Sequence, residues 1–511
     1  MISICLAFFL AALDRTIVGV AVPAISDEFQ SFGDISWYQT AFTLCNCVFQ
    51  LPMGKIYARH SCVVLQHPLT LLQKYFPAKW TTVTSVIIFE IGSVVCATAP
   101  NSVAFIIGRA ITGVGAAGIL VGTQIIVRDI LPLEKRPKWQ GLLGAMFGLS
   151  SVVGPILGGA FTTHVSWRWC FYISLPVGAI ALIGLIFVLP ASPALDKIEG
   201  TWLDVAKKFD PLGNACIFPG LLCLLLALQW GGIIYPWTDA RVIATLVVGV
   251  LLMIAFALAQ LWVQENGTAP PRIVRQRTIA AAAISFVGIG GALVITAFYL
   301  PLWFQVVQGV SASEAGIRLI PYFLSTVLFA IISGVAVSKV GYYTPFLILG
   351  SAILIAASGA FTTLRPDTGK AGWIGFQILV GAGIGLCLQQ PITAAQTVLA
   401  DTDVPTGITF ITFCQILGST VFVSICQAVL TQTLSSELAA SLPGFDTSSI
   451  ARVGATDIRR LVPESQMGLV LEAYNKGVRN VFYVGIGGGV LALVASLGLE
   501  WRSVKKPAVE K

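Results

Sequence analysis

The sequence predicts an all-α polytopic membrane protein with fourteen transmembrane helices. The first observation is the composition: 56% of the 511 residues are hydrophobic and 11% are charged, whereas soluble domains contain about 45–50% apolar and about 25% charged residues. The second is that apolar runs of about 20 residues, long enough to cross a bilayer as a helix, recur along the chain. The third is that Lys and Arg gather in alternate connections between these runs. The mean hydropathy of +0.85 argues against a disordered or water-soluble chain.

In chain order, the apolar runs form groups of six, two and six helices. We therefore expect an N-terminal six-helix half over 1–190, a linker with two extra transmembrane helices over 191–278, and a C-terminal six-helix half over 279–511. Many runs contain Gly and Pro, which membrane helices tolerate because their neighbours satisfy the freed backbone groups. The predicted spans are 3–25, 37–57, 78–99, 103–127, 137–162, 169–190, 212–231, 240–262, 279–307, 313–339, 343–364, 371–399, 405–434 and 477–500.

The longest polar stretch, 435–476, is predicted to be an extracellular loop of the C-terminal half. Apolar residues recur among its polar ones, at Leu438, Leu442, Ile450, Ile458 and Leu461. This pattern predicts that part of the stretch lies as a helix on the membrane surface.

The distribution of Lys and Arg places both termini in the cytoplasm. With that orientation the inner connections are basic, whereas the outer connection after the first span holds three acidic residues and no basic one. The inner connection with Asp401 and Asp403 is a local exception. Met1 lies almost at the first span, so we expect no cleaved signal peptide; either the cytoplasmic tail is nearly absent or the sequence begins late. The inner basic residues lie within 55–79, 128–138, 197–208, 272–277 and 502–511 and at Lys339.

Several classes of function are disfavoured. The net charge of +7 (31 basic minus 24 acidic residues) does not indicate nucleic-acid binding, because in a membrane protein the location of charge matters more than its sum. The 11 Cys are mostly isolated in apolar runs, which favours free thiols, and the three His lack ligand spacing. No clustered catalytic set indicates an enzyme, no phosphate-binding loop indicates ATP drive, and too few intramembrane charges exist to line a channel. We expect no metal and no cofactor.

Two carboxylates, Asp14 and Glu90, fall inside predicted spans. Charge in the hydrocarbon region is costly and usually functional. Apolar surroundings favour the neutral form of a carboxylate, which lets it bind and release a proton near neutral pH. Asp14 is therefore the first candidate for a proton site and Glu90 the second. The alternative is that Asp14 is a helix-end residue that pairs with Arg15.

Arg109 is the third intramembrane charge. Small residues follow it at Gly113 and Gly115, where they allow a neighbouring helix to approach closely while the arginine faces the protein interior. The alternative is an arginine that reaches out to the membrane interface.

The segment SSVVGPILGG at 150–159 combines a helix-bending proline with glycines. Pro155 removes a backbone hydrogen bond and bends the span. Gly154, Gly158 and Gly159 permit tight packing against a partner helix, which would shape a gate or block a proton leak. The alternative is an ordinary Gly-Pro kink.

These segments resemble motifs of the major facilitator superfamily, and in particular its fourteen-span drug:proton antiporters, including fungal toxin-efflux and multidrug pumps. Departures from the family pattern are Gly19, Thr112, Ser150 and Ser174, where Asn, Gln, Gly and Asn are usual. The aromatic residues of the last segment suit an interface belt. The similar segments are LDRTIVGVAVP at 13–23, RAITGVGAA at 109–117, 150–159 and WRWCFYISLP at 167–176.

The resemblance implies the major facilitator fold, with nested inverted repeats, a substrate site near the midplane and alternating access. It also implies that Arg109 takes part in proton transfer and that 150–159 is the motif of antiport rather than uptake. Gln389 and Gln390 lie in a further similar segment. Their amides either hydrogen-bond a polar substrate or bridge helices, and the sequence favours neither.

The connection between the second and third spans departs from the family. The acidic residue usual there is absent, so its gate-latching role cannot be transferred. Removing 58–73 restores a pattern like that of related fungal pumps. This segment is either translated intron sequence or a true insertion, which loops tolerate cheaply.

The predicted function is proton-coupled efflux of lipophilic secondary metabolites, mycotoxins or drugs by alternating access. The alternative is a proton symporter of the same fold that imports siderophores or other small molecules. The expected partners are a small lipophilic substrate, protons and the lipid bilayer, with the protein acting as a monomer. The expected location is the plasma membrane, with a vacuolar or vesicular membrane as the alternative.

Overall fold

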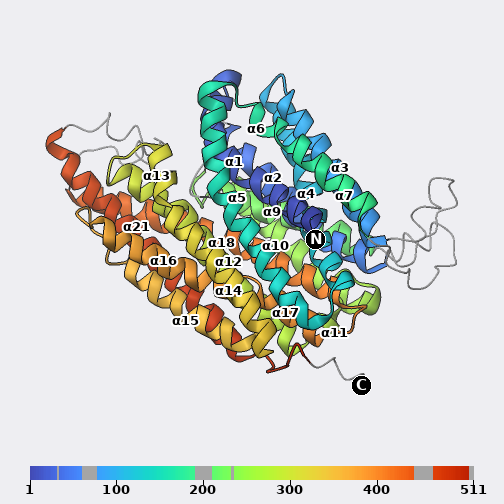
Figure 1. Cartoon of the computed structure of the whole chain (residues 1–511). Helices are drawn as coiled ribbons and strands as arrows, with labels where there is room; N and C mark the ends of the chain where they lie inside the picture. Colours follow the sequence, from blue (N-terminus) through green and yellow to red (C-terminus); the bar gives the residue numbers. More distant parts are fainter. Residues whose placement is uncertain (32–33, 60–76, 190–209, 232–234, 442–463, 506–511) are drawn as a thin grey trace.

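The computed structural model describes residues 1–31, 34–59, 77–189, 210–231, 235–441 and 464–505. Within these residues the chain is a bundle of long helices, and its only β-pairings are two isolated bridges. The predicted all-α class is therefore confirmed (Figure 1). The first ten helices are α1 (Ile2–Phe29), α2 (Ile35–Arg59), α3 (Pro77–Ala97), α4 (Ser102–Ile130), the short η4 (Leu133–Lys135), α5 (Arg136–His164), α6 (Trp169–Tyr172), α7 (Ser174–Phe187), α9 (Pro211–Trp230) and α10 (Ala240–Val263). The remaining ten are η5 (Gln264–Asn266), α11 (Pro271–Val274), α12 (Arg277–Val306), α13 (Ala312–Arg318), α14 (Ile320–Val340), α15 (Thr344–Phe361), α16 (Lys370–Cys387), α17 (Gln390–Val398), α18 (Val404–Ser441) and α21 (Glu464–Leu497).

Thirteen helical segments of the described chain are long and apolar enough to cross a membrane. The predicted span 37–57 is not among them, although α2 has 25 residues. Its sequence carries Thr43, Asn46 and Gln50, and these polar side chains lower its hydropathy. Together with α2, the thirteen segments are consistent with the fourteen spans that we expected.

Several predicted spans are interrupted helices. The span 313–339 is divided at Leu319 into α13 and α14, and 371–399 is divided at Leu388 and Gln389 into α16 and α17. Each new helix has a proline in its first turn, at Pro321 and Pro391. A proline has no N–H to donate and crowds the preceding turn, so the earlier helix ends there. The span 169–190 is likewise divided into α6 and α7.

The predicted loop 435–476 is shorter than expected. Helix α18 continues to Ser441 and α21 already begins at Glu464. The expectation of a surface helix is wrong for Leu438, which is 1% exposed and belongs to a buried apolar cluster. The other four apolar residues of this stretch lie outside the described residues, as do 60–73 of the suspected insertion.

The helices pack in two groups that meet along a seam (Figure 1). Helix α1 packs on α5, and α4 packs on both α2 and α3. In the other group α12 packs on α18 and α21, and α16 packs on α14 and α15. The groups touch where α5 meets α14 and where α2 meets α18, while α9 and α10 pair with each other beside α2.

The aromatic residues of 167–176 do not form a uniform interface belt. Trp167 and Phe171 are 4% and 1% exposed, and both rings pack edge-on against Phe105. Trp169 is 49% exposed and fits the expectation. The buried members are anchored to the end of α1, because the Trp167 Nε1–H donates to Glu28 at 2.7 Å. Burial raises the pKa of the Glu28 carboxyl, but the hydrogen bonds from Trp167 and Arg168 outweigh it and leave the pKa below its ordinary value.

Candidate functional site

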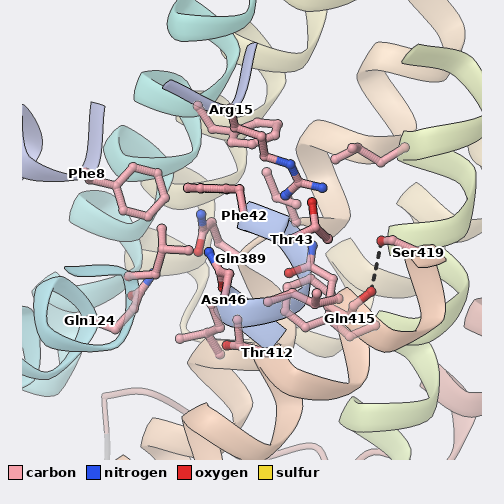
Figure 2. Close-up of a pocket in the computed structure, with 17 residues that line it drawn as sticks. Phe8, Arg15, Phe42, Thr43, Asn46, Gln124, Gln389, Thr412, Gln415 and Ser419 are labelled. Atoms are coloured by element: carbon pink, nitrogen blue, oxygen red, sulfur yellow. Dashed lines mark hydrogen bonds between the residues drawn. The ribbon is translucent and has the colours of Figure 1, made fainter. Parts of the chain in front are cut away.

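A cavity lies between the two helix groups (Figure 2). Its walls come from α1, α2, α4 and α5 on one side and from α12, α17, α18 and the α16–α17 connection on the other. Apolar walls with a few polar groups are typical of sites that bind small organic molecules. The lining residues are Phe8, Arg15, Phe42, Thr43, Asn46, Leu120, Gln124, Phe147, Phe286, Leu293, Leu388, Gln389, Ile392, Thr412, Gln415, Ile416 and Ser419.

The two glutamines at the α16–α17 break have different surroundings. Gln389 lines the cavity, and a Cβ atom added to Gly144 of α5 would lie 3.2 Å from its Nε2. The Gln390 amide instead donates to Ser333 and, at 3.1 Å, to the Leu386 carbonyl. Of the two interpretations that the sequence left open, the cavity geometry fits Gln389 and the bridging of helices fits Gln390.

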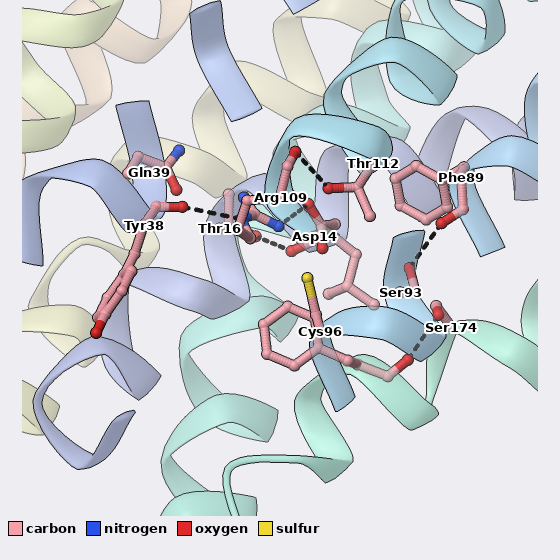
Figure 3. Close-up of polar contacts among 12 residues, drawn as sticks. Asp14, Thr16, Tyr38, Gln39, Phe89, Ser93, Cys96, Arg109, Thr112 and Ser174 are labelled. Carbon is pink, nitrogen blue, oxygen red and sulfur yellow. Dashed lines mark hydrogen bonds and ion pairs between the residues drawn. The ribbon is translucent and has the colours of Figure 1, made fainter. Parts of the chain in front are cut away.

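Asp14 and Arg109 form a buried ion pair, with 2.6 Å between Arg109 Nη1 and Asp14 Oδ2 (Figure 3). The arginine is 0% exposed and the aspartate 5%. The alternatives of an Asp14–Arg15 pair and of an arginine at the interface do not describe this structure. The two opposite charges attract each other strongly because they are shielded from water. Removing one of them would leave the other buried without a partner, which strongly destabilises a protein.

Neighbouring groups fix the orientation of the Arg109 guanidinium. Its Nε–H donates to the Tyr38 carbonyl at 2.9 Å, and its Cζ atom lies 4.6 Å from the centre of the Phe42 ring. Its Nη2 has no hydrogen-bond partner within the described residues. Phe42 also lines the cavity, so one aromatic ring contacts both the ion pair and the space where a ligand would lie.

Glu90 does not join the Asp14–Arg109 pair through a hydrogen bond. Its Oε2 accepts from the Ser174 hydroxyl of α7 at 3.1 Å, while its Oε1 is buried without a described partner. Gly178, one turn along α7, makes room for this carboxylate, since a Cβ atom there would overlap Glu90 Oε1. The carboxylate therefore lies between α3 and α7, away from the cavity lining.

The glycine motif of α5 packs against the segment of α1 that carries Asp14. A Cβ atom on Gly154 would lie 2.3 Å from the Thr16 hydroxyl, and one on Gly158 would lie 2.9 Å from the Ile17 carbonyl oxygen. A Cβ atom on Gly159 would meet nothing closer than 4.0 Å. Pro155 lies inside α5 on a different face, near Gly316.

The small residues after Arg109 bring two helices onto α4. A Cβ atom on Gly113 would lie 2.5 Å from the Phe42 carbonyl oxygen of α2, and one on Gly115 would lie 2.5 Å from the Phe89 nitrogen of α3. The predicted close approach is therefore present on two sides of α4, and it places Arg109 beside Tyr38 and Phe42.

Several cavity residues were not identified from the sequence, and Arg15 is the foremost. In the sequence, Arg15 is recognisable only as a possible partner of Asp14. A usable signal was nevertheless present in the polar residues of otherwise apolar helices, which recur at helical spacing: Thr43 and Asn46 in α2, and Thr412, Gln415 and Ser419 in α18. Within the described chain, no group of three His, Cys, Asp or Glu side chains is placed to hold a metal ion.

A family model described as Major Facilitator Superfamily matches residues 4–423. The chain belongs to the major facilitator superfamily. Similar proteins include "MFS-type efflux pump MFS1" of Arthroderma benhamiae, with 43% identity over 99% of this chain and 92% of that protein. "Efflux pump aflT" of Aspergillus parasiticus is 41% identical over 99% of this chain and 96% of its own length.

Solved structures of other transporters share the fold. The proton:xylose symporter XylE superposes with a TM-score of 0.60 at 12% identity, covering 99% of this chain and 97% of that one. The human organic anion transporter MFSD10 gives a TM-score of 0.58 at 12% identity, covering 95% and 98%. At this level of identity the likeness concerns the fold alone.

Proposed function

We propose that this superfamily member is a proton-coupled efflux pump that exports small lipophilic molecules, such as secondary metabolites, mycotoxins or drugs. The observation that carries the proposal is the buried Asp14–Arg109 ion pair, which contacts the cavity through Phe42. The efflux direction is supported by full-length relatives named efflux pumps.

In the proposed mechanism, a proton and the substrate act on the same helix. Proton binding to Asp14 neutralises its carboxylate and weakens the attraction to Arg109. The same helix α1 contributes Phe8 and Arg15 to the cavity, so a shift of α1 changes the substrate site. Protonation from outside then favours substrate release, and proton loss inside restores the ion pair and the loading state. Glu90 is the second candidate to carry a proton.

The proposal includes the arrangement in the membrane. Residues 1–190 and 279–511 form the two moving halves and 191–278 link them, with both termini in the cytoplasm of a plasma-membrane protein that acts as a monomer. On this orientation the end of the bundle where α4 leads into α5 faces the cytoplasm. Gly154, Pro155, Gly158 and Gly159 then form the outer part of α5, where their packing on α1 limits proton leakage.

The first experiment compares metabolites inside cells and in the medium, with and without the gene. We expect that, without the gene, a lipophilic compound is depleted from the medium and accumulates inside the cells. That compound is then used with purified protein in proteoliposomes that contain a pH-sensitive dye. Asp14→Asn should abolish substrate-driven proton flux, and Asp27→Asn, which removes an exposed carboxylate from the same helix, should not.

Two outcomes contradict the proposal. If deleted cells leave an iron chelate in the medium, the protein is an importer of the same fold. If Asp14→Asn retains full coupled flux at equal protein amounts, Asp14 is not the proton site.

A further inference from the structure

Arg15 gives the cavity a positive charge that no other lining residue balances. Among the seventeen described side chains that line it, Arg15 is the only ionisable one. The rest are apolar or carry neutral amides and hydroxyls. In Figure 2 the Arg15 guanidinium extends from α1 into the space between these side chains.

The guanidinium has no partner in the described part of the protein. No described hydrogen bond or ion pair involves it, and the adjacent carboxylate of Asp14 is bound to Arg109 instead. Successive residues of a helix point about 100° apart, which lets α1 present Asp14 to α4 and Arg15 to the cavity. Phe8, two turns before Arg15, lines the same cavity.

Amide oxygens in the cavity wall are also unpartnered. Asn46 Oδ1, Gln124 Oε1 and Gln389 Oε1 are all buried without a described hydrogen bond. Buried polar atoms are normally hydrogen-bonded. A ligand with hydroxyl groups would satisfy these acceptors, while its apolar body would lie against the phenyl rings of Phe8 and Phe42.

We propose that the exported substrate is an organic anion, a hydroxylated aromatic acid whose ionised oxygen is bound by Arg15. This inference rests on the proposed function and specifies its substrate class. A partly buried cation without a counter-ion is costly, so an anionic ligand gains from supplying one. A planar guanidinium also forms paired hydrogen bonds with a carboxylate. The same unbalanced charge disfavours organic cations.

The test measures binding of matched probes to the full-length protein in lipid nanodiscs by isothermal titration calorimetry. The probes are 6-hydroxy-2-naphthoate, which is anionic, and its methyl ester, which is neutral and of nearly the same shape. We expect the wild type to bind the acid at least about tenfold more tightly, as for a hydrogen-bonded charge. Arg15→Gln should remove this preference but still bind the ester, and Arg15→Lys should retain part of it.

Arg318→Gln is the matched control, because Arg318 pairs with Glu314 outside the cavity lining. It should leave the preference for the acid unchanged. The inference is overturned if the wild type binds the acid no more tightly than the ester, or if Arg15→Gln keeps the full preference. Proton flux in proteoliposomes distinguishes a failure of this inference from a failure of the proposed function. If the ester drives proton flux and the protein does not prefer the acid, only the inference of an anion site is wrong. If the protein prefers the acid but neither probe drives proton flux, proton coupling is wrong and the anion site is retained.

Discussion

Two adjacent residues of α1 make different contacts because a helix turns between them. Asp14 contacts α4 and Arg15 contacts the cavity. Asp14 can be predicted from the sequence, because a carboxylate inside a span is costly and the segment around it resembles a family motif. The role of Arg15 cannot be predicted, because spacing along a chain does not reveal which of two neighbouring charges finds a counter-ion.

Asp210 illustrates a charge that is fully partnered. It precedes α9 and accepts hydrogen bonds from Gly213, Gln260 and Thr268 at 2.7–2.9 Å. Burial raises the pKa of this carboxyl, but those hydrogen bonds outweigh burial and hold its pKa below the ordinary value. They tie the start of α9 to the end of α10.

This network predicts a pH-dependent stability. Because the folded pKa of Asp210 lies below the unfolded value of about 3.9, its ionised form stabilises the protein above about pH 4, and the contribution disappears as the pH falls through the folded pKa. Asp210→Asn should lower the free energy of unfolding by about 1–3 kcal/mol at neutral pH. Thermal unfolding of both proteins between pH 3 and 7 should show the difference shrinking at low pH. A difference that is constant with pH would contradict this assignment.

At the scale of an element, the glycines of α5 allow close packing on two neighbouring helices, α1 and α14. Gly154 and Gly158 meet α1, whereas Gly141 and Gly334 meet where α5 crosses α14. The helix itself could be predicted closely, as 137–162 against Arg136–His164. The breaks at Leu319 and Leu388 were missed because an apolar run continues through them, and only the prolines that follow indicate where the backbone turns.

The α5 motif offers a prediction with its control built in. Gly158→Ala brings a Cβ atom to 2.9 Å from a backbone oxygen of α1, which cannot move away as a side chain would. We expect this substitution to lower the free energy of unfolding by about 1–3 kcal/mol through overpacking. We also expect it to uncouple proton flux from export. Gly159→Ala, with nothing closer than 4.0 Å, should behave as the wild type. Equal proton leak in the two variants would show that packing on α1 does not seal the pathway.

At the scale of the whole molecule, the two helix groups make a close backbone contact where α4 leads into α5. A Cβ atom on Gly334 would lie 2.5 Å from the Pro137 carbonyl oxygen. At the same end Arg128 donates to the Asp401 carbonyl at 2.7 Å. The acidic connection that was an exception to the charge rule therefore joins the two groups. The sequence could not indicate this, because the contact spans 273 residues.

This contact predicts how one end of the molecule opens. Gly334→Ala should destabilise the closed arrangement by about 1–3 kcal/mol and speed amide hydrogen exchange in the first turn of α5 and the last turns of α14. Gly375→Ala, on a glycine of α16 with nothing within 4 Å, is the matched control. Identical exchange in both variants would mean that this end does not depend on close backbone contact.

The polarity of α2 has a consequence for how the protein is made. The Thr43 and Asn46 side chains that α2 contributes to the cavity also help to make this helix too polar to count among the thirteen apolar spans of the described chain. During synthesis a helix enters the bilayer from the translocon according to its own hydrophobicity, so α2 is poorly suited to enter alone. Its main packing partner, α4, is made later. We therefore expect α2 to enter the bilayer stably only after α4 has been made, so that the two helices insert together.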